Sequence, residues 1–344
     1  MSWTKILFIN LTVFVGLILT AELGLRVLWT GYKCISSECD YARITKAKVY
    51  DNQDGYQEKN IGLTEYNELL GYQPKAGFSK NIVNDWGNKY LSINEKGYRS
   101  NGNTDLKIEK DRQNKILVVG DSFAFGDQVH DNETWPSCVE SNTKRLTLNA
   151  GVYGYGSAQA VRRAHLIQKN EIANTVILSI LIGSDFQRDQ LKFRYGFPRP
   201  AVIIKDGVVS YADVPPIESV GTKWYPKDMG SLSWITEYSM LAAKLVIALD
   251  IDQSGMRRNE KHPNAATLNQ IIEFTLTEFS KLEVENKFIL LQYLKAEFPK
   301  PTSVTLKIKN QTILFAQKKN ITVIDTFSIL EREQISGKEP IWDG

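Results

Sequence analysis

The sequence is poor in the side chains that most often bind metals: it has three histidines and three cysteines among 344 residues, and they do not occur at metal-ligand spacing. It also has no large surplus of charge. With a formal net charge of +3 and no basic stripe, a nucleic-acid partner is not expected. The glycine-rich stretch at residues 120–126, GDSFAFG, lacks the lysine and hydroxyl residue of a phosphate-binding loop. We therefore expect no nucleotide, no metal and no other cofactor.

Internal repeats and low-complexity tracts are absent, and a slightly negative mean hydropathy excludes a protein with many membrane spans. One long apolar run lies at the amino terminus, where residues 6–21 are interrupted only by Asn10 and two threonines. If Glu22 and Arg26 extend toward water, about 20 residues are available to cross a bilayer core. A cleaved signal peptide is the alternative, but the residues before Glu22 make a poor cleavage site. We expect an uncleaved transmembrane anchor over residues 1–30.

The residues that flank this run give opposite indications of its orientation. Lys5 precedes the run and five basic residues follow it before position 50, which by the positive-inside rule keeps the downstream part in the cytoplasm. Cys34 and Cys39 are close enough in sequence for a small disulfide loop outside the cytoplasm, and two free thiols are an equal alternative. The third cysteine, Cys138, lies in a predicted helix, and we expect it to be in the core.

The remainder of the chain changes character near residue 114. Residues 31–114 are polar, rich in Tyr, Asn and Gly, and indicate a juxtamembrane extension with short strands, for example at 89–93. Beyond it, apolar runs alternate with helical patterns. The predicted strands are 115–119, 145–148, 175–182, 287–293 and 321–324, and the predicted helices are 133–142, 158–169, 265–283 and 302–319. This alternation predicts an α/β domain over residues 115–344, a three-layer, doubly wound, flavodoxin-like parallel sheet.

A long insertion, residues 187–262, separates the third and fourth predicted strands. It contains a predicted hairpin, 201–204 and 208–211, around the turn Lys205-Asp206-Gly207, and a helix near 233–250. The insertion leaves the carboxyl end of a central strand, where open sheets bind ligands. It is therefore either a lid or substrate-facing subdomain, or an additional packing layer.

Ser122 follows the first predicted strand of the domain and is expected at the carboxyl edge of the sheet. Gly120 permits a tight turn, and Ser122 then falls at the start of a helix, where backbone N–H groups stabilise an anion. A serine in this place is either a helix N-cap or a nucleophile. The stretch is not the GxSxG elbow of α/β-hydrolases, because Ala124 stands two positions after the serine.

The stretch GDSFAFG resembles the first signature block of the SGNH/GDSL hydrolases, in which the serine is the nucleophile. LNAGVYGYG, residues 148–156, resembles the second block, and Gly154 matches the glycine whose N–H enters the oxyanion hole of that family. The segments ELLGYQPKAG, INEKGYRSN and VHDNETWP are similar to parts of membrane-anchored bacterial members. The resemblance covers most of the chain.

Two positions depart from the family pattern. In the third block, IGSDF, Gly183 and Asp185 match, but Ser184 replaces the asparagine whose amide completes the oxyanion hole. In the last block, EPIWDG, Asp343 matches the aspartate, and no histidine follows it in this chain. The histidines present are His130 in a loop, His165 in a predicted helix, and His262 ahead of the fourth strand.

The resemblance implies a membrane-anchored, extracytoplasmic serine esterase that removes acyl groups, such as acetyl, from a carbohydrate or other envelope substrate. Ser122 would attack the ester, the Ser122 and Gly154 N–H groups with Ser184 would hold the oxyanion, and Asp343 would orient a histidine beyond Gly344. We accordingly expect a truncated form of a longer hydrolase. An inactive relative that serves as a binding or scaffold protein, and an acyltransferase, are the alternatives.

Overall fold

The computed structural model describes residues 3–35, 63–84, 87–102, 114–194, 197–216, 239, 241, 265–294 and 300–335. By its contacts the chain divides into two compact units. The first comprises Met1–Tyr56 and Val220–Glu260, and the second comprises Gln57–Ser219 and Lys261–Gly344. Four predicted features lie outside the described residues: Cys39, the helix near 233–250, His262 and Asp343.

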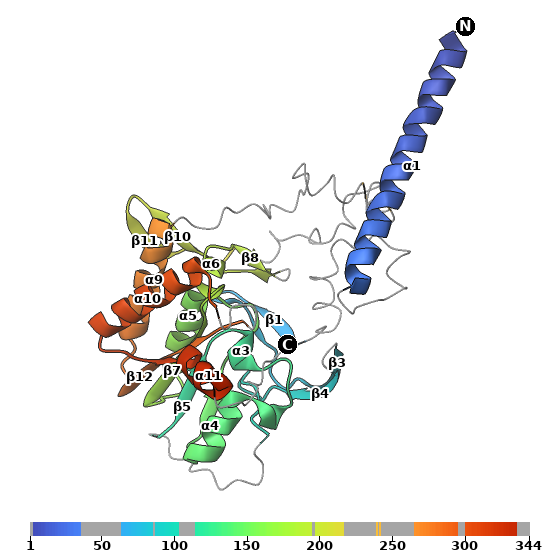
Figure 1. Cartoon of the computed structure of the whole chain (residues 1–344). Helices are drawn as coiled ribbons and strands as arrows, with labels where there is room; N and C mark the ends of the chain where they lie inside the picture. The colour runs from blue at the N-terminus through green and yellow to red at the C-terminus, as the bar shows by residue number, and fades with distance from the viewer. Residues whose placement is uncertain are drawn as a thin grey trace. The chain divides into compact units, whose positions relative to one another are not determined.

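The first unit contains the long helix α1 (Trp3–Ile35), drawn in blue in Figure 1. Thr4–Leu25 is long and apolar enough to cross a membrane, as a signal sequence near the amino terminus also is. The hydroxyls of Thr12 and Thr20 donate to the carbonyls four residues earlier, at 2.9 and 2.8 Å, and so are satisfied within the helix. The predicted apolar helix is present.

The second unit is built on a sheet of five parallel strands: β5 (Ile116–Val119), β6 (Thr147–Asn149), β7 (Thr175–Leu181), β12 (Asn286–Gln292) and β13 (Thr322–Asp325). Their order is β13-β12-β7-β5-β6, and every neighbouring pair is parallel. Counted along the chain, this is the 2-1-3-4-5 order of flavodoxin-like folds. The predicted fold class is confirmed.

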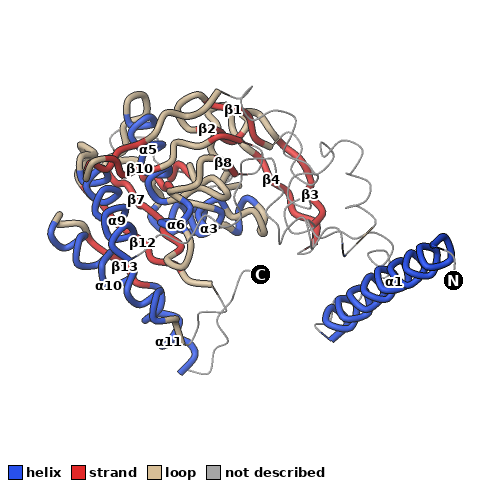
Figure 2. The backbone as a smooth tube through the Cα atoms, turned by 90° about the horizontal axis from the view of Figure 1, so that it is seen from above, coloured by secondary structure: helices blue, strands red, loops and turns tan. Residues whose placement is uncertain are grey.

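Helices cover both faces of this sheet (Figures 1 and 2). One face carries α5 (Ser157–Gln168), α9 (Ala265–Ser280) and α10 (Ser303–Lys318), while α4 (Trp135–Thr143) packs on the other, and α11 (Thr326–Ile335) follows β13. Alternation along β5 explains the two layers. Leu117 and Val119 belong to the main core with α5 and α9, whereas Ile116 and Val118 pack with Trp135 and Val139 of α4.

The polar extension forms two antiparallel pairs, β1 (Thr64–Asn67) with β2 (Gly71–Pro74) and β3 (Ser79–Asn84) with β4 (Gly87–Ser92). After β4 the chain returns to the sheet, where Arg99 forms an isolated bridge with Asn149 at the end of β6. Leu70, Tyr72 and Tyr98 are buried in the main core. This part of the extension is therefore packed on the sheet as part of the same compact unit.

The described part of the insertion adds two short antiparallel pairs. They are β8 (Phe193–Arg194) with β9 (Phe197–Pro198), and β10 (Val202–Lys205) with β11 (Val208–Tyr211). The predicted hairpin is confirmed, and its turn has positive φ at both Asp206 (52°) and Gly207 (78°), as a two-residue hairpin turn requires. Val202 is in the main core, and the Tyr211 hydroxyl donates to the Ala158 carbonyl at 2.8 Å. The described residues of the insertion thus form a packing layer.

The prediction that Cys138 lies in the core was wrong. Cys138 is in a helix, as expected, but it is exposed. The buried positions of α4 are Pro136, Ser137 and Glu140, and the Glu140 carboxylate accepts a hydrogen bond of 2.9 Å from the Thr147 N–H of β6. A polar residue therefore takes the inward position, and the thiol faces water.

Candidate functional site

Ser122 is the first residue of a short helix, α3 (Ser122–Phe125), which begins directly after β5 and its turn. The N-cap is Asp121, whose Oδ1 accepts the Phe123 N–H at 2.9 Å. The capping role that Ser122 could have had is therefore taken by its neighbour. Among the described residues, neither the N–H nor the hydroxyl of half-buried Ser122 has a hydrogen-bond partner. Both groups are available to a substrate.

Two glycines allow the turn after β5 to lie close to its neighbours at the edge of the sheet. A Cβ on Gly151 would lie 2.5 Å from the Phe125 nitrogen of α3, so this glycine lets the turn after β6 approach α3, and a Cβ on Gly120 would lie 2.8 Å from the Cβ of Ser179 in β7. The Val152 N–H also donates to the Gly120 carbonyl at 3.0 Å. Because no side chain separates these backbones, the two turns form one continuous edge.

Gly154 lies in the second of these turns with φ 74°, a left-handed conformation that glycine adopts without strain. In the part of the chain that the structure describes, its N–H donates to no acceptor. The first two signature blocks therefore supply two backbone donors without internal partners, those of Ser122 and Gly154. Such donors at the carboxyl edge of a parallel sheet are suited to binding an oxyanion.

The turn after β7 differs, because its polar groups are engaged within the protein. Ser184 precedes the short helix α6 (Asp185–Arg188), and its N–H donates to the Leu181 carbonyl at 3.1 Å. Its hydroxyl is oriented toward Asp185 Oδ1, at 3.4 Å. The Ser184 hydroxyl, which was predicted to be the third oxyanion donor, therefore points at the next residue of its own turn.

Charged side chains connect this third turn to the first. Arg188 Nη1 donates to Asp121 Oδ2 at 2.9 Å and to Asp185 Oδ1 at 2.8 Å, and Asp185 Oδ2 accepts the Leu181 N–H at 2.8 Å. Burial raises the pKa of Asp185 well above its usual range, and the negative charge of Asp121 raises this pKa further. Arg188 supplies the positive charge that compensates the two carboxylates beside Ser122.

A third aspartate, Asp189, caps helix α5. Both of its carboxylate oxygens accept the Ala158 N–H at 3.0 Å, and Gly156 makes room, since a Cβ there would overlap Asp189 Oδ1. Burial raises the pKa of Asp189 to about 7, although the hydrogen bonds from α5 oppose the shift. Asp189 therefore ties the start of α5, which follows the Gly154 turn, to the end of α6.

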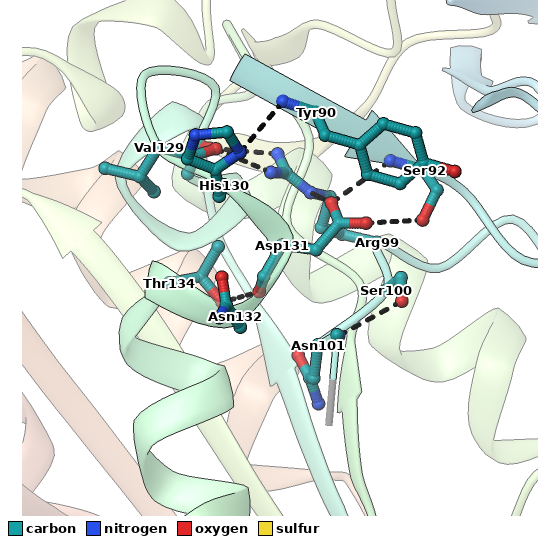
Figure 3. Close-up of polar contacts among 12 residues, drawn as sticks. Tyr90, Ser92, Arg99, Ser100, Asn101, Val129, His130, Asp131, Asn132 and Thr134 are labelled. Atoms are coloured by element: carbon teal, nitrogen blue, oxygen red, sulfur yellow. Dashed lines mark hydrogen bonds and ion pairs between the residues drawn. The ribbon is translucent and has the colours of Figure 1, made fainter. Parts of the chain in front are cut away.

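The end of α3 is held by Arg99, a fully buried residue of the extension (Figure 3). Its guanidinium donates to the carbonyls of Gly126 at 2.9 Å and Val129 at 2.8 Å, and to Asp131 Oδ1 at 2.8 Å. It also lies 5.2 Å from the centre of the Phe125 ring. Burial lowers the pKa of Arg99, and the charge of Asp131 opposes this change. The extension thereby fixes the segment that follows the serine.

The two described histidines are engaged away from Ser122. His130 Nδ1 accepts the Tyr90 N–H at 3.0 Å, beside Asp131 (Figure 3). His165, at the last turn of α5, contacts the Glu278 carbonyl through Nε2 at 2.9 Å. Neither forms a hydrogen bond with Ser122. No cluster of His, Cys, Asp and Glu in the described ranges has the arrangement of a metal site.

Of the predicted site residues, the structure describes Ser122, Gly154 and Ser184 and places them at the carboxyl ends of the three consecutive strands β5, β6 and β7. Sequence reasoning missed Arg99, which binds the Gly126 carbonyl after α3, and Arg188, which binds Asp121 before it. The only signal for Arg99 was its presence in the segment INEKGYRSN, which resembles the leader of membrane-anchored family members.

No protein-family model and no curated protein sequence matches the chain. Solved structures that are similar to it include the SGNH-hydrolase family esterase AlinE4, at 14% identity over 67% of this chain and 87% of that chain, with a TM-score of 0.34. A putative lipolytic protein of the G-D-S-L family from Desulfitobacterium hafniense is similar at 15% identity over 63% of this chain and 80% of that chain, with a TM-score of 0.32. A variant of an acetyl xylan esterase from Geobacillus stearothermophilus is similar at 13% identity over 68% of this chain and 85% of that chain, with a TM-score of 0.34. Identities and TM-scores this low leave the roles of individual residues to the geometry of the site.

Proposed function

We propose that this chain is a serine esterase of the SGNH/GDSL type and that Ser122 is its nucleophile. One observation carries the proposal: Ser122 begins a helix at the carboxyl edge of the sheet, and within the described residues its hydroxyl, its N–H and the N–H of Gly154 all lack partners. Gly154 is buried, and a buried N–H without an acceptor among the described residues is costly in a purely structural turn. It suits a site that binds a reacting carbonyl.

In the proposed reaction, Ser122 Oγ adds to the carbonyl carbon of an ester and its proton passes to a base. The Ser122 and Gly154 N–H groups donate to the oxyanion that forms, and the alcohol leaves with the proton. Water then cleaves the acyl-serine and releases the acid. The Ser184 hydroxyl, which is directed at Asp185 Oδ1, is not one of these donors in the proposed reaction. The substrate class that we propose is an acyl ester, such as an O-acetyl group, of a carbohydrate or other envelope molecule.

The base in this proposal is a histidine oriented by Asp343. His130 and His165 are unsuited, because each is hydrogen-bonded to a backbone group elsewhere. The candidates are His262 and a histidine that follows Asp343 in a longer chain. We further propose that α1 anchors the protein in a membrane and that the α/β unit lies outside the cytoplasm. Alkaline-phosphatase fusions after the domain should be active, and silent fusions would contradict this topology.

A non-catalytic binding protein with the same fold is the second candidate. The observation that favours it is the third turn, where Ser184 replaces an amide donor and is engaged with Asp185. Acyl transfer to a sugar hydroxyl is a variant of the first candidate, because it shares the formation of the acyl-serine.

Fluorophosphonate labelling and p-nitrophenyl acetate hydrolysis test the proposal. We expect weak activity from the 344-residue chain and an increase by orders of magnitude when a tail places a histidine two or three residues after Asp343. Ser122→Ala should abolish labelling of the tailed protein, while the control Cys138→Ala, on the exposed face of α4, should not alter it. Labelling that survives Ser122→Ala would contradict the proposal. Strong turnover without the tail that is lost in His262→Ala would instead identify His262 as the base.

A further inference from the structure

The peptide between Tyr153 and Gly154 is held from its carbonyl side by a residue of the extension. Tyr72 is fully buried in β2, and its hydroxyl donates to the Tyr153 carbonyl at 3.0 Å. That carbonyl and the Gly154 N–H belong to the same planar peptide unit. The hydrogen bond from Tyr72 therefore acts on the group whose other end is the proposed oxyanion donor.

This hydrogen bond matters because a glycine restricts the rotation of its backbone dihedral angles less than any other residue. Gly154 has φ 74°, and a glycine with no Cβ tolerates rotation of the peptide that precedes it. Its N–H has no acceptor among the described residues that would fix the plane from the amide side. A donor on the carbonyl then determines where the N–H points. A hydrogen bond to a peptide carbonyl also polarises the peptide and strengthens its N–H as a donor.

The Tyr72 hydroxyl is itself fixed by its surroundings. The Tyr72 ring packs edge-to-face on Tyr155, with 5.2 Å between centroids and 83° between planes, and lies 6.2 Å from the Tyr153 ring. The Tyr155 hydroxyl donates back to the Tyr72 carbonyl. Gln159 Nε2 donates to the Leu70 carbonyl, which ties the start of β2 to α5 at 2.7 Å. The two tyrosines on either side of Gly154 are thus locked against the β1–β2 hairpin.

We propose that Tyr72 is a positioning residue of the oxyanion hole: its hydroxyl orients and polarises the Tyr153–Gly154 peptide so that the Gly154 N–H is presented to the substrate. The inference rests on the proposed function, which assigns Gly154 to the oxyanion. It adds that a residue of the extension, 81 positions before Tyr153, sets the geometry of the Gly154 donor.

The kinetic test compares two isosteric changes in the tailed, active protein. Tyr72→Phe removes the hydrogen bond to the peptide and keeps the ring. Tyr155→Phe removes the hydrogen bond to the Tyr72 carbonyl between the same two segments, together with the contact between the Tyr155 hydroxyl and Arg163, and leaves the hydrogen bond to the 153–154 peptide in place. We expect Tyr72→Phe to lower kcat about five- to tenfold with KM within about twofold, since the donor is misdirected rather than deleted. Tyr155→Phe should change kcat by less than about twofold while lowering Tm to a similar extent.

A spectroscopic test reads the peptide directly and does not need activity. The sequence contains three Tyr–Gly pairs, at 153–154, 155–156 and 195–196. Labelling tyrosine carbonyls with ¹³C and glycine nitrogens with ¹⁵N in the micelle-bound chain therefore yields three correlated peptide signals, and Tyr153→Phe identifies the first by deleting it. Tyr72→Phe should move this signal, and Tyr155→Phe should move it much less.

The two tests separate the two proposals. If neither the wild-type chain nor the tailed protein hydrolyses esters, the proposed function fails, while a shifted 153–154 signal still supports Tyr72 as the residue that orients this peptide. An unmoved signal in Tyr72→Phe overturns the inference. Equal losses of kcat in Tyr72→Phe and Tyr155→Phe overturn it as well, because the effect would then belong to the packing of the hairpin.

Discussion

The turns after β5 and β6 and the turn after β7 end at the same edge of one sheet, yet they are built in opposite ways. In the first two, the N–H groups of Ser122 and Gly154 have no acceptor among the described residues. In the third, the Ser184 N–H is bound to Leu181, and Asp185 is bound to both Leu181 and Arg188. The first two turns offer N–H donors that are unpaired within the described part of the chain, whereas the polar groups of the third turn are paired within the protein.

This difference shows that the turns at the edge of the sheet have separate roles. Backbone donors can remain unpaired only where the surrounding structure holds them, and here Arg99 and Tyr72 of the extension contact the segments next to Ser122 and Gly154. The third turn contributes charge: Arg188 pairs with Asp121, the residue before Ser122, and with Asp185. The donors and their electrostatic support therefore come from different strands.

The largest effect is expected when the positive charge of Arg188, which joins the third turn to the first, is removed. Arg188→Met would leave Asp121 and Asp185 buried without their partner, and we expect a loss of about 3–5 kcal/mol in the free energy of unfolding. Urea titration checks this. Lys281→Met, which removes an exposed partner of Glu278, is the control and should cost less than about 1 kcal/mol. Equal losses would show that the Arg188 network contributes no more than a surface pair.

The titration of Asp189 gives the next largest effect. Its pKa is raised from 3.8 to about 7 in the folded chain, so between pH 4 and 7 the folded state binds more protons than the unfolded state. Stability should therefore fall as pH rises through this window, by at most roughly 4 kcal/mol for a shift of about three units. Asp189→Asn removes this titration and should make the fall of Tm with pH less steep, while Asp185, whose pKa is also raised, keeps part of the slope. Asp206→Asn, in the exposed hairpin turn, should leave the slope as it is. A wild-type Tm that is constant or rises over this range contradicts the prediction.

The contact between the first two turns can be tested at Gly151. Gly151→Ala places a methyl group 2.5 Å from the Phe125 nitrogen, which must displace α3, and we expect a cost of about 1–3 kcal/mol. Displacement of α3 should also reduce fluorophosphonate labelling of Ser122 in the tailed protein. Gly207→Ala, where a Cβ meets nothing within 4 Å, strains a turn outside the site and should leave labelling unchanged. Undiminished labelling in Gly151→Ala would show that the close approach is not needed.

The smallest effect is expected at Ser184. Because its hydroxyl makes only a 3.4 Å contact with Asp185, Ser184→Ala should change stability by less than about 0.5 kcal/mol and kcat by less than about threefold. Thermal unfolding and p-nitrophenyl acetate hydrolysis measure both quantities. A much larger loss of kcat with unchanged stability would assign Ser184 to the oxyanion hole. All three turns would then supply donors to the substrate.

Local patterns were sufficient to predict the sheet. Runs such as 175–182 and 287–293 correspond to β7 (Thr175–Leu181) and β12 (Asn286–Gln292), because buried parallel strands are apolar on both faces and stand out from the helices between them. The start of a helix at Ser122 followed from Gly120 and the end of the strand before it, although the N-cap proved to be Asp121.

Contacts between distant segments could not be predicted in this way. Arg99 and Tyr72 lie in a polar stretch whose periodicity does not reveal which backbone carbonyls they reach. The orientation of Ser184 toward Asp185 depends on a side-chain rotation that no pattern encodes. Cys138 was misplaced because the pattern of a short helix leaves its inward face uncertain. The inward positions are Ser137 and Glu140, and Glu140 is held there by its hydrogen bond from Thr147.

The hydrogen bonds between β2 and the Gly154 segment also bear on the order of folding. They join residues 81, 83 and 89 positions apart, so each closes a long loop whose entropy must be overcome before the contact forms. The β5–β6 pair, by contrast, closes after about 30 residues. During refolding, the β6-β5-β7 part of the sheet should therefore pair before the extension docks. Reactivity of Ser122 toward a fluorophosphonate should then recover more slowly than amide hydrogen-exchange protection of β5 and β6.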